Sequence, residues 1–148
     1  MAAPGGSVKR PGPAVRDTDR DGMPDPWETA NGLNPRRTDA TVDRDRDGLS
    51  NIAEYRARTN PSRGDTEKDG MPDGWEVVAY RLDPLRNEAA ADPDGDELSN
   101  AAEYYVDDNP RRADSDHNGV GDGDEDFDHD GRTDADEFRD GHDPRDAD

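Results

Sequence analysis

The sequence predicts a mostly irregular fold, built from tandem loop-then-helix repeats with short α-helices and little or no β-sheet. Three observations lead to this fold class. One spacing of acidic residues recurs six times, most of these recurrences run into a short helical stretch that stops at an Asn-Pro or Asp-Pro pair, and only 27% of the 148 residues are hydrophobic. Burial of so little apolar surface gains too little free energy to offset the conformational entropy that the chain loses on folding. Another source of stability is therefore expected.

The recurring spacing places acidic or amide side chains at offsets 1, 3, 5, 9 and 12 of a twelve-residue window. The six windows, called loops 1 to 6 below, span 17–28, 43–54, 65–76, 92–103, 114–125 and 126–137. This is the ligand order of an EF-hand-like calcium loop, in which Gly at offset 6 allows a sharp turn, the carbonyl at offset 7 is a ligand and a bidentate Glu stands at offset 12. Six such matches, each ending in Glu, indicate calcium binding.

Each loop therefore offers five side chains and one backbone carbonyl to a metal ion. The candidate metal ligands are Asp17, Asp19, Asp21, Met23, Asp25 and Glu28 in loop 1; Asp43, Asp45, Asp47, Leu49, Asn51 and Glu54 in loop 2; Asp65, Glu67, Asp69, Met71, Asp73 and Glu76 in loop 3; Asp92, Asp94, Asp96, Leu98, Asn100 and Glu103 in loop 4; Asp114, Asp116, Asn118, Val120, Asp122 and Glu125 in loop 5; and Asp126, Asp128, Asp130, Arg132, Asp134 and Glu137 in loop 6. We expect about six Ca²⁺ ions and no catalytic residues.

The ligand chemistry favours calcium over other metals. The donors are hard oxygens and the chain has no Cys to offer sulfur, while Mg²⁺ prefers strict octahedral geometry and keeps its waters. Zinc would need clustered His or Cys. We expect His117, His129 and His142 to face solvent instead.

The net charge of −20 is concentrated in the loops. Of the 39 Asp and Glu, 27 stand at ligand offsets, which leaves 12 acids against 19 Lys and Arg. A uniformly acidic, disordered chain has no reason to show this partition. Six divalent ions would bring the charge to −8. Because an empty loop crowds four or five carboxylates together, we expect the calcium-free chain to be largely disordered and the ions to order it.

A longer repeat underlies the loops. Loop 1 matches loop 3 at 9 of 12 positions, and loop 2 matches loop 4 at 8 of 12. We therefore predict a flexible leader over 1–16, repeat pairs over 17–64 and 65–113, and a shortened pair over 114–148. In the last pair no connector separates the loops, because Glu125 adjoins Asp126 directly.

A short helix is expected after every loop except the fifth. The stop is an Asx-Pro pair six residues after the terminal Glu in four cases and seven residues after Glu76. These pairs are Asn34-Pro35, Asn60-Pro61, Asp83-Pro84, Asn109-Pro110 and Asp143-Pro144. The residue before proline avoids the α region, which limits each helix to about two turns.

Aromatic residues recur at fixed places on these helices. Trp27 and Trp75 stand at offset 11, whereas Tyr55, Tyr104 and Phe138 follow a terminal Glu. We expect the Trp of one loop to pack against the Tyr or Phe that follows the next, giving each repeat pair a small core. Exposed aromatics that bind a partner are the alternative. Loop 5 has Asp124 at offset 11, so it lacks this packing residue.

No amphipathic helix precedes the loops, so the chain is not a paired EF-hand. The strings DTDRDGMPDPWE, DRDRDGLSNIAEYRARTNP and DFDHDGRTDADEFRDGHDP closely resemble bacterial thrombospondin type-3 repeats, over roughly 17–148. The resemblance implies calcium-loaded repeats of secreted or surface proteins, often spacers beside adhesive, enzymatic or outer-membrane domains. The chain departs from animal members in lacking disulfides. It also has Glu97 where Gly belongs at offset 6 of loop 4, which strains that turn.

Three classes of function follow from these observations. The first is a calcium-ordered rigid spacer or adhesive module, which could contact a neighbouring domain or a cell-surface partner. A calcium buffer or sensor is the alternative, although a sensor needs a helix pair that opens an apolar groove. We do not expect an enzyme, because metal ligation accounts for every carboxylate cluster. The charge opposes nucleic-acid binding, and no apolar run is long enough for membrane insertion.

We expect an extracellular or cell-surface location, because loops this numerous suit millimolar calcium. The leader has no apolar segment typical of a signal peptide, which predicts a fragment of an exported protein.

Overall fold

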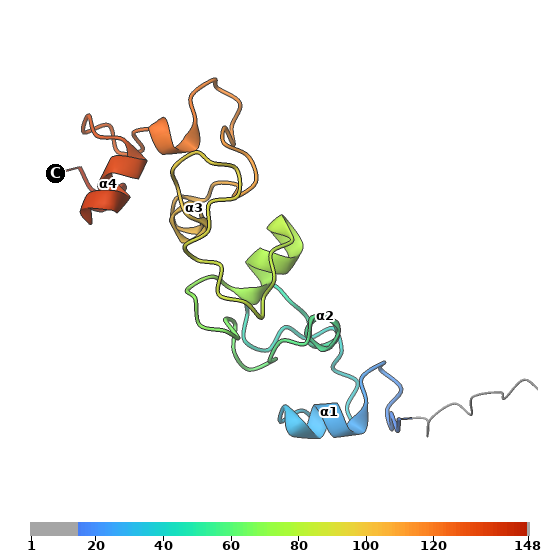
Figure 1. Ribbon diagram of the computed structural model, residues 1–148. Helices are drawn as coiled ribbons and strands as arrows, with labels where there is room; N and C mark the ends of the chain where they lie inside the picture. The colour runs from blue at the N-terminus through green and yellow to red at the C-terminus, as the bar shows by residue number, and fades with distance from the viewer. Residues whose placement is uncertain (1–14, 148) are drawn as a thin grey trace, which may run out of the picture. The chain divides into compact units, whose positions relative to one another are not determined.

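A computed structural model describes residues 15–147 of the chain (Figure 1). The helical elements are α1 (Asp25–Ala30), α2 (Asn51–Ala57), the π-helix η1 (Trp75–Tyr80), α3 (Asn100–Val106), the 3₁₀ turn η2 (Asp122–Asp124) and α4 (Asp134–Asp140). The described residues contain no β-strand. The predicted class, mostly irregular with short helices and no sheet, is confirmed at this level. The predicted leader, 1–16, lies outside the described residues except for its last two.

The chain divides into two compact units, Met1–Ala40 and Thr41–Asp148. The first contains loop 1 and α1, and the second contains the other five loops and their helices. The repeat pairs expected over 17–64, 65–113 and 114–148 stay a prediction. Over the described residues, no helix is both long and apolar enough to cross a membrane.

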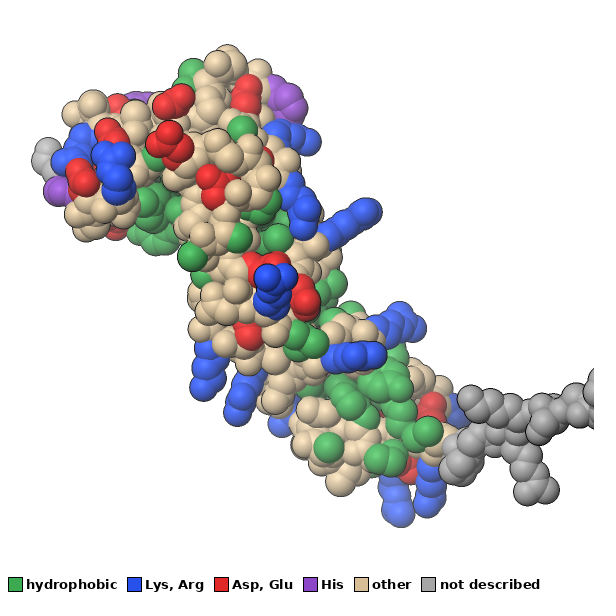
Figure 2. Space-filling model, in the orientation of Figure 1, with side chains coloured by type: hydrophobic (Ala, Val, Ile, Leu, Met, Phe, Trp, Pro, Cys, Tyr) green, Lys and Arg blue, Asp and Glu red, His purple; other side chains and the backbone are tan. Residues whose placement is uncertain are grey.

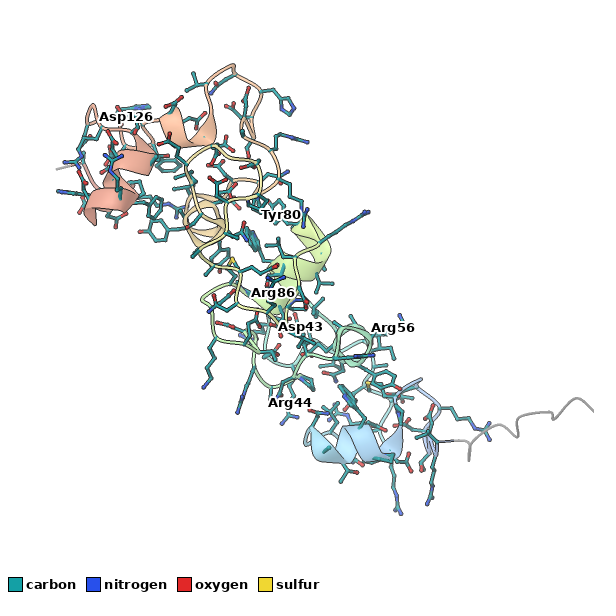
Figure 3. All side chains as sticks on the ribbon, in the orientation of Figure 1. Asp43, Arg44, Arg56, Tyr80, Arg86 and Asp126 are labelled. Atoms are coloured by element: carbon teal, nitrogen blue, oxygen red, sulfur yellow. The ribbon has the colours of Figure 1, made fainter. Side chains whose placement is uncertain are left out.

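The backbone of all six loops is closed by the same two hydrogen bonds. The N–H at offset 9 donates to the carbonyl of the residue just before the loop, at 2.7–3.1 Å. The N–H at offset 6 donates to the offset-1 carboxylate at 2.9–3.2 Å. The side chain that opens each loop therefore also holds its turn, as for Asp43 and Asp126, which are labelled in Figure 3.

The turn of each loop requires a positive φ at offset 6. Five loops meet this requirement with glycine, at φ between 92° and 102°, whereas loop 4 places Glu97 there at φ 82°. An L side chain is strained in this region, and glycine is not. The strain expected at Glu97 from the sequence is therefore present in the backbone.

Each α-helix begins at offset 9 of its loop and ends before the Asx-Pro pair. In α2 the last residue is Ala57, and Arg58 follows in the left-handed conformation at φ 71° with its N–H bonded to the carbonyl of Glu54. Asn60 then forms the next turn, since its side chain and its carbonyl accept the N–H groups of Ser62 and Arg63. The Asx-Pro pair thus builds the turn beyond the helix, three residues later than its end.

The one helix with a longer spacing to its stop is a π-helix. Asp83 lies seven residues after Glu76, one more than in the other repeats. The N–H groups of Arg81 and Leu82 both reach the carbonyl of Glu76, one residue further along the chain than the equivalent bonds of α2. The wider turn of the π-helix accommodates the extra residue before the Asp-Pro pair.

Apolar packing in the second unit is confined to small clusters. Leu98, Ala102, Val106 and Ala135 are buried together, with Phe138 packed against them. The ring of Trp75 lies against Tyr80, the last residue of η1 and labelled in Figure 3, at 4.6 Å between centroids, and against Tyr104 at 5.1 Å. The Trp75–Tyr104 contact confirms the predicted Trp-to-Tyr packing in the second repeat pair.

The other two repeat pairs differ. Phe138 packs edge-on against Tyr105 at 5.9 Å rather than against a Trp, because loop 5 supplies none. The contact expected between Trp27 and Tyr55 stays a prediction.

Candidate metal centres

Polar and charged side chains form a large part of the interior of this protein. Besides four prolines, eight hydrophobic residues are buried in the described part of the chain, against eleven polar or charged ones. All of the eleven except Thr59 stand at offset 9 or 12 of a loop. On the face shown in Figure 2, Lys and Arg side chains project outward, whereas Asp and Glu appear only as small patches. The side chains predicted to bind metal therefore occupy the place of a conventional core.

Five offset-12 glutamates are completely buried without a hydrogen-bond donor. Glu28, Glu54, Glu76, Glu103 and Glu137 are each 0% exposed, and both carboxylate oxygens of each accept no hydrogen bond. The ion pairs of the described chain involve other acids. A buried carboxylate without donor or cation costs several kcal/mol. These ten oxygens can be compensated either by protons on the carboxyl groups or by a cation that no side chain supplies.

The offset-3 acid faces the offset-12 glutamate in each of these loops. The offset-3 side chain also has buried oxygens that lack a donor, one in Asp19 and Asp128 and both in Asp45, Glu67 and Asp94. In all five loops this acid is the negative charge that contributes most to raising the pKa of the glutamate. Like charges held together in this way favour uptake of a cation between them.

Burial, and then the facing offset-3 acid, raise the pKa of all five glutamates. The pKa is about 7 for Glu28, about 8 for Glu54, about 9 for Glu76 and Glu103, and raised for Glu137. At neutral pH a carboxyl whose pKa is about 8 or 9, as in Glu54, Glu76 and Glu103, holds a proton unless a cation replaces it. The loops are therefore poised to exchange protons for a metal ion.

Two overlapping groups of carboxylates form at each of the first two loops. In every group, one oxygen from each residue lies within 4.8 Å of the others. The first kind joins offsets 1, 3 and 5, as in Asp17, Asp19 and Asp21 and in Asp43, Asp45 and Asp47. The second kind joins offsets 5 and 12 to an acid from outside the loop, as in Asp21, Glu28 and Asp39 and in Asp47, Glu54 and Asp73. The geometry can hold hard divalent cations such as Ca²⁺.

Asp39 is a candidate ligand that sequence reasoning missed. It lies outside the loop pattern, yet its N–H donates to Asp21 at 3.2 Å and its carboxylate joins Asp21 and Glu28. Glu88 repeats the backbone part of this arrangement, since its N–H donates to Asp69 at 3.0 Å, while its carboxylate accepts the N–H of Asp83 and pairs with Arg86. Both acids stand five residues after the Asx of an Asx-Pro stop. That fixed distance is the signal that could have identified them.

The offset-9 residues are partly committed to local hydrogen bonds. Asp25 accepts the backbone N–H and the hydroxyl of Thr18, at 2.7 and 2.6 Å, and pairs with Arg16 at 3.2 Å. Its pKa is lowered, first by the Thr18 hydroxyl. Asn100 donates its amide to the carbonyl of Glu88 and leaves its buried Oδ1 without a donor. Oxygens at offset 9 therefore remain oriented by the loop and available as ligands.

Loop 5 differs from the others at both ends of its predicted site. Glu125 is only partly buried and accepts a hydrogen bond from the amide of Asn118 at 2.8 Å. Val120 at offset 7 is 43% exposed, whereas the four apolar residues at that offset in loops 1 to 4 are at most 2% exposed. The loop without an aromatic at offset 11 is thus also the one whose glutamate is not enclosed.

The three histidines are exposed, as expected, and His129 places Nδ1 2.7 Å from the carbonyl oxygen of Asp126.

A scan against protein-family models, a search of curated proteins and a search of solved structures each found no match. The resemblance to thrombospondin type-3 repeats therefore stays a prediction from the sequence.

Proposed function

We propose that this chain is a calcium-binding structural module whose six loops are ordered by about six Ca²⁺ ions. One observation carries the proposal. Five glutamates at offset 12 are 0% exposed, and none of their ten oxygens accepts a hydrogen bond. A divalent cation in each of these loops would supply the missing partner, and carboxylates with some amide oxygens are the ligands that Ca²⁺ prefers.

The proposed role is a rigid spacer or adhesive region of a secreted or surface protein. Its helices have at most seven residues, and its apolar core is small, so the ions would supply much of the folding free energy. The role is structural rather than catalytic. A sensor is disfavoured because no α-helix directly precedes any loop in the described residues, and loop 6 follows only the three-residue 3₁₀ turn η2, so no helix pair is present to open.

Calcium titration of the chelator-treated protein tests this proposal. Far-UV circular dichroism follows the helices, and the fluorescence of Trp75 follows its packing between Tyr80 and Tyr104. We expect a largely unfolded spectrum in chelator that gains helix and buried Trp near millimolar calcium, and a much weaker response to magnesium.

Two other outcomes would contradict the proposal. A fold already complete in chelator, with saturation near micromolar calcium, would indicate a buffer or sensor. No spectral response to calcium, together with no bound calcium by equilibrium dialysis, would remove calcium binding altogether.

A further inference from the structure

The junction between loops 2 and 3 brings a carboxylate of one loop into the metal group of the other. Asp73, at offset 9 of loop 3, has an oxygen within 4.8 Å of oxygens from Asp47 and Glu54 of loop 2. Asp73 also belongs to a group within its own loop, with Asp65 and Glu67. All four of its partners are acidic, and Asp73 itself is 0% exposed.

The loop 2 side of this junction has oxygens that lack any donor. Glu54 is 0% exposed with both oxygens free of hydrogen bonds, and Oδ2 of Asp47 is buried in the same state. Asp73 is held in place by Thr66, whose N–H and hydroxyl donate to its two oxygens at 2.9 and 2.7 Å. Each carboxylate oxygen has a second lone pair, so Asp73 can bind metal while it keeps these bonds.

Backbone packing holds the two loops at this distance. A Cβ at Gly74 would overlap the carbonyl oxygen of Asp47 and press on Gly48. Glycine at offset 10 of loop 3 therefore permits the close approach that places Asp73 beside loop 2. Loop 1 has Pro26 at this offset instead.

The same junction occurs between loops 4 and 5. Gly123, also at offset 10, lies where a Cβ would overlap the carbonyl oxygen of Asp96. Asp122 at offset 9 is 1% exposed, and its oxygens accept the N–H and hydroxyl of Ser115. Because the backbone of Gly123 touches Asp96, the neighbouring Asp122 stands beside loop 4 as Asp73 stands beside loop 2.

We propose that Asp73 is a ligand of the cation in loop 2 as well as in loop 3, and that Asp122 has the same role between loops 4 and 5. This inference rests on the proposed calcium binding. Loops 2 and 4 are then incomplete on their own, and loops 3 and 5 supply the missing charged ligand. The functional unit of metal binding spans the boundary between the repeat pairs.

The test is a calcium titration of ¹⁵N-glycine-labelled protein followed by NMR. The amides of Gly22, Gly48 and Gly70 report on loops 1, 2 and 3, because each donates to its own offset-1 carboxylate. Replacing a shared ligand should weaken both sites that use it. We expect Asp73→Asn to raise the calcium midpoints at both Gly48 and Gly70 by about tenfold or more, since ligand charge sets loop affinity.

Two control variants separate a shared ligand from general damage. Asp25→Asn removes the matching offset-9 carboxylate, which Thr18 holds in the same way, and should move only the midpoint at Gly22. Asp65→Asn impairs loop 3 without removing Asp73, and should move Gly70 with a much smaller change at Gly48. An unchanged Gly48 midpoint in Asp73→Asn, or an equal shift in Asp65→Asn, would overturn the inference. If no glycine of the unmodified protein responds to calcium, the proposed function itself fails.

Discussion

Replacing Glu97 with glycine should stabilise the second unit. Glu97 has φ 82°, lower than the 92–102° of the five glycines at the same offset, yet its N–H still donates to Asp92 at 3.2 Å. A non-glycine residue in this left-handed region costs about 1–2 kcal/mol. Relieving this strain is offset by about 0.5–1 kcal/mol, because glycine gives the unfolded chain more conformational entropy. The net stabilisation is therefore about 0.5–1 kcal/mol.

Thermal unfolding in saturating calcium measures this difference. For a domain of this size, about 1 kcal/mol shifts Tm by roughly 4 °C, so Glu97→Gly should raise Tm by about 2–4 °C. Glu97→Ala removes the carboxylate but keeps a Cβ at the same φ, and should leave Tm within about 1 °C of the original. Equal stabilisation by Ala and Gly would refute backbone strain and point to charge instead.

The reciprocal variant is Gly70→Glu in loop 3. A Cβ at Gly70 would meet no atom within 4 Å, so only its φ of 98° opposes a side chain. We expect Tm to fall by at least as much as Glu97→Gly raises it. An unchanged Tm would show that the turn tolerates side chains at offset 6, and the strain argument would fail for both loops.

Three further predictions concern charge and packing. In the folded protein the pKa values of Glu54, Glu76 and Glu103 are about 8 to 9, above their ordinary value of 4.5. These carboxyls therefore contribute stability that is fully present below pH 4.5 and is lost as the pH rises toward 9. The helical circular dichroism of calcium-free protein should therefore increase as the pH is lowered from 9 to 5, and a loss of helix on acidification would contradict this. Calorimetry in two buffers should detect proton release on calcium binding at pH 7. Glu54→Gln should remove one calcium site by equilibrium dialysis, whereas Glu125→Gln should have a much smaller effect, because Glu125 is only partly buried and already bonded to Asn118. Equal effects would count against enclosure as the determinant. Trp75→Ala should lower the free energy of unfolding of the second unit by about 2–3 kcal/mol, measured by denaturant unfolding. Removing a half-buried Trp that contacts Tyr80 and Tyr104 costs less stability than removing a fully buried one. A change below about 0.5 kcal/mol would show that the aromatic cluster is not a core.

The local features of the fold could be read from the sequence because they depend on residues within one loop. Gly at offset 6 requires only a positive φ, and an Asx-Pro pair forms its turn from its own side chain and carbonyl. The same holds for the burial of apolar residues at offset 7, such as Met71 and Leu98. Even the π-helix has a sequence signal, since the extra residue between Glu76 and Asp83 must be accommodated in the helix.

The sequence by itself predicted where the loops lie and which side chains are candidate ligands, and it explains why each helix is short. Only the tertiary structure decided that Asp39 joins loop 1, that Asp73 joins loop 2, and that Glu125 is left outside an enclosed site. The reason is physical. Ligand spacing within a loop is fixed by local backbone geometry, whereas a carboxylate from outside the loop arrives only when a connector folds back or a glycine such as Gly74 lets two backbones touch.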